Sequence, residues 1–262
     1  MKVKDVTAAL EQFAPLPLQE GYDNAGLQIG LTTEREVSGV LLCLDVTEKV
    51  VAEAEARGCN LIVAHHPLLF RPLRQLCGRT QPERVAALAL RADVAVYAAH
   101  TNLDNASGGV SFEMAAQLGL EDVRFLQPCG AGGSGAAGRL PRALAAEAFL
   151  ERVSEVFGCR ALLHNGFRGR DIETVALCGG AGDYLLNEAA AQGADCFLTG
   201  EVHYHTYFGH ENSMLICALG HYESERHATG LMRRVLEKAL PGLRIVLSGV
   251  DTNPVHLFYT RA

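Results

Sequence analysis

Short, unbroken apolar runs alternate with amphipathic segments along most of the chain. The run VSGVLLCLD, residues 37–45, is typical of strands that are buried on both faces in a parallel sheet. A segment of helical periodicity follows from about Thr47 to Arg57, Gly58 is expected to end it, and a second apolar run, NLIVA, comes next. A capped helix that leads into VAVYAA, residues 94–99, continues the same order. This alternation predicts an α/β fold.

A stretch without apolar periodicity interrupts the alternation near the middle of the chain. Residues 129–138, CGAGGSGAAG, have the composition of a flexible linker or surface loop, so we place a domain boundary near Leu120 to Gln127. Pro141 is then expected to open a helix that Gly158 closes. We therefore predict three segments: a first α/β domain at 1–124, an inserted second α/β domain at 125–220, and a C-terminal helix and strands at 221–262 that complete the first domain.

The second half of the chain repeats part of the first. A shift of 135 residues places residues 38–66 on residues 173–201 without a gap, and seven positions are identical. The shared order of strand, helix, glycine and strand indicates two copies of one α/β unit. Coincidence between two ordinary βαβ units is the alternative, and it predicts the same fold class. The identical pairs are Val40/Val175, Leu42/Leu177, Cys43/Cys178, Glu53/Glu188, Ala54/Ala189, Ala56/Ala191 and Gly58/Gly193.

Composition and charge exclude several classes of protein. The 262 residues are 48% hydrophobic and 20% charged, which suits two packed domains. The net charge is −7 and the basic residues are scattered, so we expect no nucleic-acid partner. The first residues lack the apolar core of a signal peptide, and the chain has no long apolar span, so we expect a cytoplasmic protein that does not bind a membrane. The eight cysteines are far apart and are interpreted as reduced core residues.

Histidines and carboxylates follow four of the predicted strands. In open α/β sheets ligands gather beyond the carboxyl ends of the strands, so these groups are expected to converge. A metal ion requires such convergence, because each imidazole or carboxylate oxygen supplies only one or two of its four to six bonds. The groups are His65 and His66 before Pro67, His100 with Asp104, Glu201 with His203 and His205, and His221 with Glu225.

Each of these features also has an ordinary structural explanation. A histidine pair before proline is often a surface turn, and His221 with Glu225 suits an ion pair at the start of a helix. Asp104 suits the N-cap of the helix that follows it. The metal hypothesis depends on the occurrence of all of these features at strand ends. The histidines without comparable neighbours are interpreted as structural or solvated: His164, His210, His227 and His256.

Four segments, in this order, resemble the signature segments of the Nif-three-like family. They are YDNAGLQIG at 22–30, HHPLLF at 65–70, HTNLD with GGVS at 100–111, and GHYESE at 220–225. The resemblance implies two similar α/β domains, a toroidal homo-hexamer and a dinuclear metal centre in the cleft between the domains. The ligands it implies are His65, His66, Asp104, His221 and Glu225, with His100 beside the site.

The second repeat departs from that family's pattern because His203 and His205 make it richer in histidine. These two residues would add substrate contacts or a further weak metal site. Some members of the family are described as GTP cyclohydrolase type enzymes and others as regulatory or interaction proteins. The family alone therefore does not decide the activity.

Two divalent ions with nitrogen and oxygen ligands favour hydrolysis, because they activate a shared water. We predict a metal-dependent hydrolase acting on a nucleotide-like or other small substrate, with GTP cyclohydrolase-like ring opening included, and with His100 and Glu201 available for proton transfer. The alternative is a non-catalytic metal-binding regulatory protein that forms a ring-shaped oligomer. A nucleotide-binding module without metal is disfavoured, because no glycine-rich fingerprint follows VLLCLD.

Two details of the predicted site stay open. Gly108 and Gly109 either present backbone N–H groups to an anionic substrate or form a plain turn. We expect no cysteine near the predicted ligands, which disfavours a metal that prefers thiolate; zinc, iron, manganese, cobalt and magnesium all suit the predicted groups.

Overall fold

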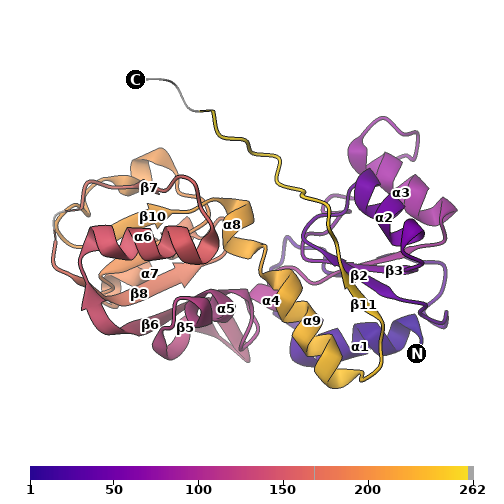
Figure 1. The fold of residues 1–262 in the computed structure, drawn as a ribbon, viewed down its shortest axis with the longest axis horizontal. Helices are drawn as coiled ribbons and strands as arrows, with labels where there is room; N and C mark the ends of the chain where they lie inside the picture. Colours follow the sequence, from indigo (N-terminus) through magenta and orange to yellow (C-terminus); the bar gives the residue numbers. More distant parts are fainter. Residues whose placement is uncertain (168, 259–262) are drawn as a thin grey trace.

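The computed structural model describes residues 1–167 and 169–258, and its strands form two sheets (Figure 1). In spatial order the first sheet contains β1 (Gly26–Ile29), β4 (Ala95–Ala98), β3 (Leu61–Ala64), β2 (Val40–Cys43) and β11 (Ile245–Leu247). The second contains β5 (Glu121–Cys129), β6 (Gly132–Leu144), β8 (Ile172–Cys178), β9 (Cys196–Thr199), β10 (Leu215–Ala218) and β7 (Leu163–His164). Together with their helices these sheets form two α/β domains, as the alternating pattern predicted.

Helices cover both faces of the first sheet. One face packs against α1 (Val3–Phe13) and α9 (Ala228–Ala239), and the other against α2 (Glu48–Ala56) and α3 (Gln81–Arg91). Alternate side chains of β2, β3 and β4 enter the two cores, so these central strands are apolar at nearly every position. Strand β1 is antiparallel to β4, whereas β4, β3, β2 and β11 are parallel.

The second sheet is mixed and is also covered on both faces. Strands β8, β9 and β10 are parallel, and β5, β6 and β7 are joined to the sheet by antiparallel pairing. Helices α5 (Val110–Gln117) and α6 (Ala146–Phe157) pack on one face, and α7 (Leu186–Ala191) packs on the other. The short helices complete the description: η1 (Leu16–Leu18), α4 (Thr101–Asp104), η2 (Asp183–Leu185), η3 (Tyr204–Tyr207) and α8 (His221–Glu225).

The predicted repeat is present in three dimensions. Adding 135 to the bounds of β3 gives those of β9, and adding it to α2 gives the combined span of η2 and α7. Strand β2 falls in the same way on the last four residues of β8. The register agrees too, because Val40 pairs with Leu61 as Val175 pairs with Cys196. The two domains therefore share one β-α-β unit.

The region predicted to be a linker is instead a β-hairpin. Residues 129–138 cover the end of β5, a two-residue turn and the first half of β6, and Cys129 pairs with Gly132 across the turn. The small residues suit tight strand packing: a Cβ at Gly133 would lie 2.6 Å from the carbonyl oxygen of Gln127. Pro141 lies within β6 and does not open a helix, because α6 begins only at Ala146. Strand β5 starts at Glu121, so the division drawn at 124/125 falls inside a strand of the second sheet.

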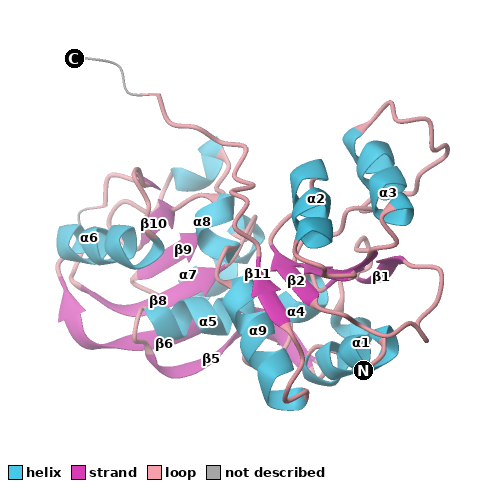
Figure 2. Ribbon diagram, turned by 45° about the vertical axis from the view of Figure 1, so that its right-hand side comes forward, coloured by secondary structure: helices cyan, strands magenta, loops and turns pink. Residues whose placement is uncertain are grey.

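The C-terminal region returns to the first domain. Strand β11 pairs with β2, and α9 packs against α1. Figure 2 shows α9 and β11 near the middle of the molecule, with the following segment running along the space between the domains. No helix formed by residues 1–167 or 169–258 is long and apolar enough to cross a membrane.

Candidate metal centre

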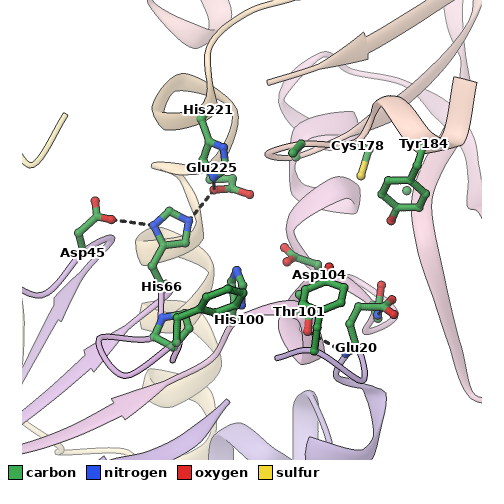
Figure 3. A pocket seen from close by; sticks show the side chains of 17 residues that line it. Glu20, Asp45, His66, His100, Thr101, Asp104, Cys178, Tyr184, His221 and Glu225 are labelled. Carbon is green, nitrogen blue, oxygen red and sulfur yellow. Dashed lines mark hydrogen bonds and ion pairs between the residues drawn. The ribbon is translucent and has the colours of Figure 1, made fainter. Parts of the chain in front are cut away.

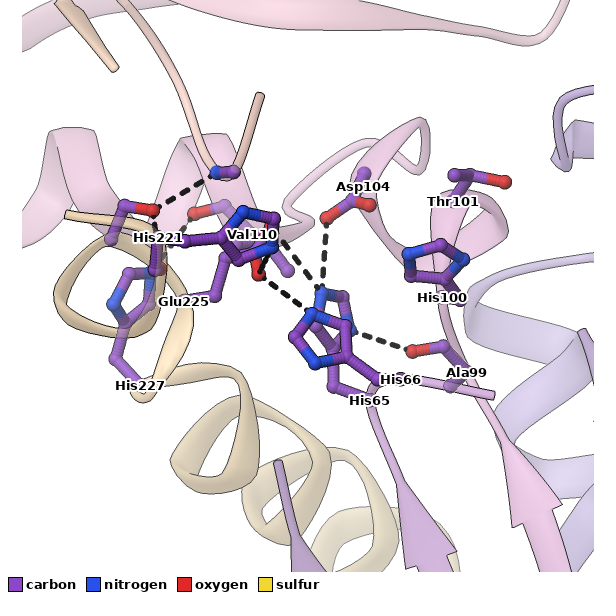
Figure 4. A network of polar contacts seen from close by, with 12 residues as sticks. His65, His66, Ala99, His100, Thr101, Asp104, Val110, His221, Glu225 and His227 are labelled. Atoms are coloured by element: carbon purple, nitrogen blue, oxygen red, sulfur yellow. Dashed lines mark hydrogen bonds and ion pairs between the residues drawn. The ribbon is translucent and has the colours of Figure 1, made fainter. Parts of the chain in front are cut away.

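The ends of three strands bring the predicted ligands together in the cleft between the domains. His65 and His66 follow β3, Asp104 ends the short helix after β4, and helix α8 after β10 begins with His221 and ends with Glu225. Ligand atoms of His65, His66 and Glu225 all lie within 4.8 Å of one another. The i, i+4 spacing on α8 places His221 beside Glu225, as the sequence predicted (Figure 4).

The carboxylate of Glu225 is the centre of the cluster. Its Oε2 lies 2.8 Å from Nε2 of His66 and 3.0 Å from Nε2 of His221. Its Oε1 lies 3.8 Å from Nε2 of His65. The two oxygens of one buried carboxylate therefore face different histidines: Oε1 faces His65, and Oε2 faces His66 and His221.

Two atoms of this cluster are buried without any hydrogen-bond partner. They are Nε2 of His65 and Oδ1 of Asp104, and they lie 3.7 Å apart. Nδ1 of His65 is 2.8 Å from the carbonyl oxygen of Ala99, to which it must donate, so Nε2 carries the lone pair of the neutral ring. Burial opposes a charge on this ring, but Asp104 and Glu225 raise its pKa. A buried lone pair that faces a buried carboxylate oxygen is costly unless a cation lies between them. These residues therefore fit a metal ion.

Outer carboxylates orient the other two histidines. Nδ1 of His66 lies 2.7 Å from Oδ1 of Asp45, whose Oδ2 accepts a hydrogen bond of 2.7 Å from the hydroxyl of Thr252. Nδ1 of His221 lies 3.0 Å from Oε1 of Glu201. Because Nδ1 is engaged in each case, Nε2 is directed at Glu225, as is usual for histidines that bind metals.

In the metal-free cluster, contacts with carboxylates raise the pKa values of the histidines. Burial opposes the charge of His66, but hydrogen bonds to Asp45 and Glu225 raise its pKa to about 10. The hydrogen bond to Glu225 raises the pKa of His221 to about 9. Burial raises the pKa of Asp104, whereas hydrogen bonds from His221 and His66 overcome the burial of Glu225 and lower its pKa. The positive charges of His66 and His221 therefore stabilise the buried carboxylate of Glu225 in the metal-free protein.

The backbone after β8 fixes the position of the Glu225 carboxylate. Gly180 has a φ of +60°, and a Cβ built there would lie 2.4 Å from Oε1 of Glu225. Its amide donates to the hydroxyl of Ser224, at 2.9 Å. Glycine is therefore required at this position by both conformation and space.

A cavity of about 460 Å³ opens beside the cluster, between the domains (Figure 3). Cys178, at the end of β8, lines it, so the expectation that no cysteine lies near the ligands is wrong. The reason is the repeat, which brings the end of β8 to the cleft as it brings the end of β2. Burial raises the pKa of the Cys178 thiol to about 12. The lining also includes Glu20, Tyr22, Asp45, His66, Phe70, His100, Thr101, Asp104, Asn105, Gly179, Tyr184, His221 and Glu225.

His100 lines this cavity and is held by a carboxylate that sequence reasoning did not single out. Its Nδ1 lies 2.7 Å from Oδ1 of Asp23, and Oδ2 of Asp23 accepts hydrogen bonds from the amide and hydroxyl of Thr101. Two of these bonds, from His100 and Thr101, lower the pKa of Asp23 to about 2 in spite of its burial. Asp45 was missed too, although its place just beyond β2 follows the strand-end rule.

The remaining predicted residues lie outside the cavity lining. Glu201 contacts Nδ1 of His221, whereas Glu225 contacts Nε2 of the same ring, and the Glu201 side chain is 59% exposed. The exposed His203 pairs with Asp183, and His205 lies in an aromatic group with Tyr204 and Phe208.

Three further residues have structural roles. His227 is half-buried close to the cluster, and desolvation lowers its pKa to about 4, which suits the first of the two roles considered for it, structural or solvated. The amide of Gly109 donates to the carbonyl oxygen of Ala106, so the pair Gly108 and Gly109 forms a plain turn.

The fold and the cluster define a two-domain α/β protein with a candidate metal site between its related domains. Within that class, the chain belongs to the Duf34/NIF3 (NGG1p interacting factor 3) family, whose model matches residues 1–254. The resemblance seen in the sequence is thereby confirmed.

Named relatives and solved structures extend over nearly the whole chain. A GTP cyclohydrolase 1 type 2 homolog of Lactococcus lactis is 34% identical to this chain. The match covers 98% of this chain and 99% of the relative. The NIF3-like protein 1 of Drosophila melanogaster is 32% identical, over 97% of this chain and 88% of its own length. A hypothetical protein of Staphylococcus aureus shares the fold with a TM-score of 0.90 at 24% identity, covering 98% of this chain and 99% of its own.

Proposed function

We propose that this protein is a dinuclear metal-dependent hydrolase acting on a nucleotide-like or other small substrate. The observation that carries the proposal is the unpartnered, buried pair formed by Nε2 of His65 and Oδ1 of Asp104, beside a carboxylate that faces three histidines. An ordinary ion-pair cluster would satisfy these two atoms within the protein.

The ligands divide into two sets around Glu225. His65, Asp104 and Oε1 of Glu225 would hold one ion, and His66, His221 and Oε2 of Glu225 would hold the other. Nitrogen and oxygen donors suit zinc, iron, manganese, cobalt or magnesium. When bound, such a pair of ions supplies Lewis acidity and activates water at neutral pH.

His100 is the side chain that we assign to proton transfer. Asp23 engages its Nδ1, so Nε2 remains to accept or donate a proton on the cavity side. Its ring centroid is 5.5 Å from that of His65 and 5.6 Å from that of His66, which places it next to the ligands without joining them. Glu201, the other residue predicted for this task, contacts His221 from outside the cavity, so we assign it to positioning.

Substrate class is supported by the cavity and by the names of relatives. The rings of Tyr22, Phe70 and Tyr184 line the same cavity as the ligands, and aromatic faces suit a planar ring. Several relatives are named GTP cyclohydrolase 1 type 2 homolog, which agrees with hydrolytic opening of a purine. Screening for activity therefore begins with nucleotides and nucleosides.

We also propose that the protein assembles into a ring of six, which rests on the family resemblance. The C-terminal segment supports a contact with another copy, because Val255, Leu257 and Phe258 are 69%, 50% and 90% exposed. Light scattering on the purified protein would then give six times the 28.1 kDa of one chain.

The test combines metal content with turnover. Untagged wild type is expected to hold close to two ions per chain by plasma mass spectrometry, and Asp104→Ala and Glu225→Ala are expected to lose them. Glu223→Ala is the matched control, because this carboxylate lies on the same helix but contacts Asn253. Wild type without metal, even after reconstitution, would refute the proposal. Two ions without hydrolysis in a broad screen would favour the non-catalytic alternative.

A further inference from the structure

A second cavity, of about 640 Å³, adjoins the metal cavity. The two share Glu20, Tyr22, Asn105 and Tyr184, so they are neighbouring compartments of one cleft. We call the second one the outer compartment. The other residues that line it are Pro17, Leu18, Gln19, Gln127, Pro128, Cys129, Gly133 and Ser134.

Two tyrosines from different domains stand where the compartments meet. Tyr22 follows η1 of the first domain, and Tyr184 lies on η2 of the second. The two residues are 67% and 61% exposed, and the ring of Tyr22 makes a T-shaped contact with that of Phe70, at a centroid distance of 6.4 Å. Figure 3 shows Tyr184 across the cavity from His66 and His100. Exposed rings at such a junction are suited to stack on a planar ring of a ligand.

The outer compartment offers hydrogen-bonding groups and one carboxylate. Glu20 is fixed at the junction, because its Oε1 accepts from Nδ2 of Asn105 at 3.0 Å and its amide donates to the hydroxyl of Thr101 at 2.9 Å. The amides of Gln19 and Gln127 and the hydroxyl of Ser134 line the compartment beyond it. Carboxylate and amide oxygens accept hydrogen bonds from hydroxyl groups, whereas a fixed carboxylate repels phosphate.

We propose that the outer compartment binds an uncharged, hydroxyl-bearing group of the substrate, such as the sugar of a nucleoside, while the planar ring lies between Tyr22 and Tyr184. The inference rests on the proposed function and narrows its substrate class from nucleotides to unphosphorylated nucleosides and similar molecules. Glu20 is the residue that determines this specificity.

Calorimetry on the metal-loaded protein tests the proposal, with adenosine and AMP as probes. Wild type is expected to bind adenosine about tenfold or more tightly than AMP, because Glu20 opposes the phosphate. Glu20→Gln keeps the acceptor for Asn105 and should reduce the ratio of adenosine affinity to AMP affinity severalfold. Tyr184→Ala should weaken adenosine binding about tenfold, since loss of one stacking partner has an effect of this order.

The control and the readout separate this inference from the hydrolase proposal. Tyr204→Ala removes a tyrosine of similar exposure outside both compartments and should leave adenosine binding unchanged. Binding heat needs no turnover, so adenosine binding to a protein with two ions but no hydrolase activity would support the compartment and refute only the hydrolase. Equal or tighter binding of AMP, or no effect of Tyr184→Ala, would overturn the inference.

Discussion

Replacing Asp45 by Asn removes one negative charge behind His66, a single proposed metal ligand, and changes little else. The asparagine oxygen can still accept the hydrogen bond from Nδ1 of His66, which spans 2.7 Å in the wild type. Its amide group would face Thr252, whose hydroxyl can turn to accept. The change therefore tests the charge of Asp45 and not the shape of the site.

The expected loss follows from the strength of that hydrogen bond. A bond to a charged group contributes about 1.5–3 kcal/mol, against about 0.5–1.5 kcal/mol for a neutral pair. Asp45 is 35% exposed, so solvent screens it and the difference lies near 1.4 kcal/mol, which is about tenfold in affinity. That value is at the lower end of the roughly 10–100-fold typical of outer-shell changes.

Asp23→Asn is the matched control. Its carboxylate also lies 2.7 Å from Nδ1 of a cleft histidine, but that histidine is His100, which we do not count among the ligands. Competition against a fluorescent chelator should show about tenfold weaker binding of one ion in Asp45→Asn, and a change under about twofold in Asp23→Asn. Unchanged affinity in Asp45→Asn, or equal losses in both folded variants, would refute the assignment of His66 as a ligand.

Two further predictions concern the same cluster. Gly180→Ala should displace the Glu225 carboxylate and reduce the metal content of the protein. Gly193→Ala is the control, because Gly193 has a similar φ of +72° but open space around it. Equal metal content in the two variants would contradict the role given to Gly180. In the metal-free protein, the pKa values of His66 and His221 are raised to about 10 and 9. Protonation of these two histidines therefore stabilises the fold fully below about pH 6.5, and this stabilisation is lost as the pH rises through 9 to 10. Metal binding at pH 7.5 should therefore release about two protons, measurable by calorimetry in buffers of different ionisation enthalpy, and release of none would contradict this account.

The sequence was sufficient for the α/β class, the repeat and the convergence of the ligands. Unbroken runs such as VLLCLD identify strands buried on both faces, and the strand-end rule then places His65, His66 and Asp104 at one edge. The i, i+4 spacing of His221 and Glu225 was enough to orient both toward one point.

Features that depend on long-range contacts were not predictable in this way. The hairpin at 129–138 has the composition of a linker, and only pairing with β5 and β8 makes its glycines and alanines part of a sheet. Asp23 contacts His100 across 77 positions of sequence, and Thr252 contacts Asp45 across 207. No local pattern marks such partners, because their side chains meet only after both domains and the C-terminal segment have packed.

We propose that two ions flank the carboxylate of Glu225, and crystals of the metal-loaded protein, measured at the absorption edge of the bound metal, would locate them. We expect two anomalous peaks per chain, one near His65 and Asp104 and the other near His66 and His221. A single peak, or peaks away from Glu225, would contradict the proposal.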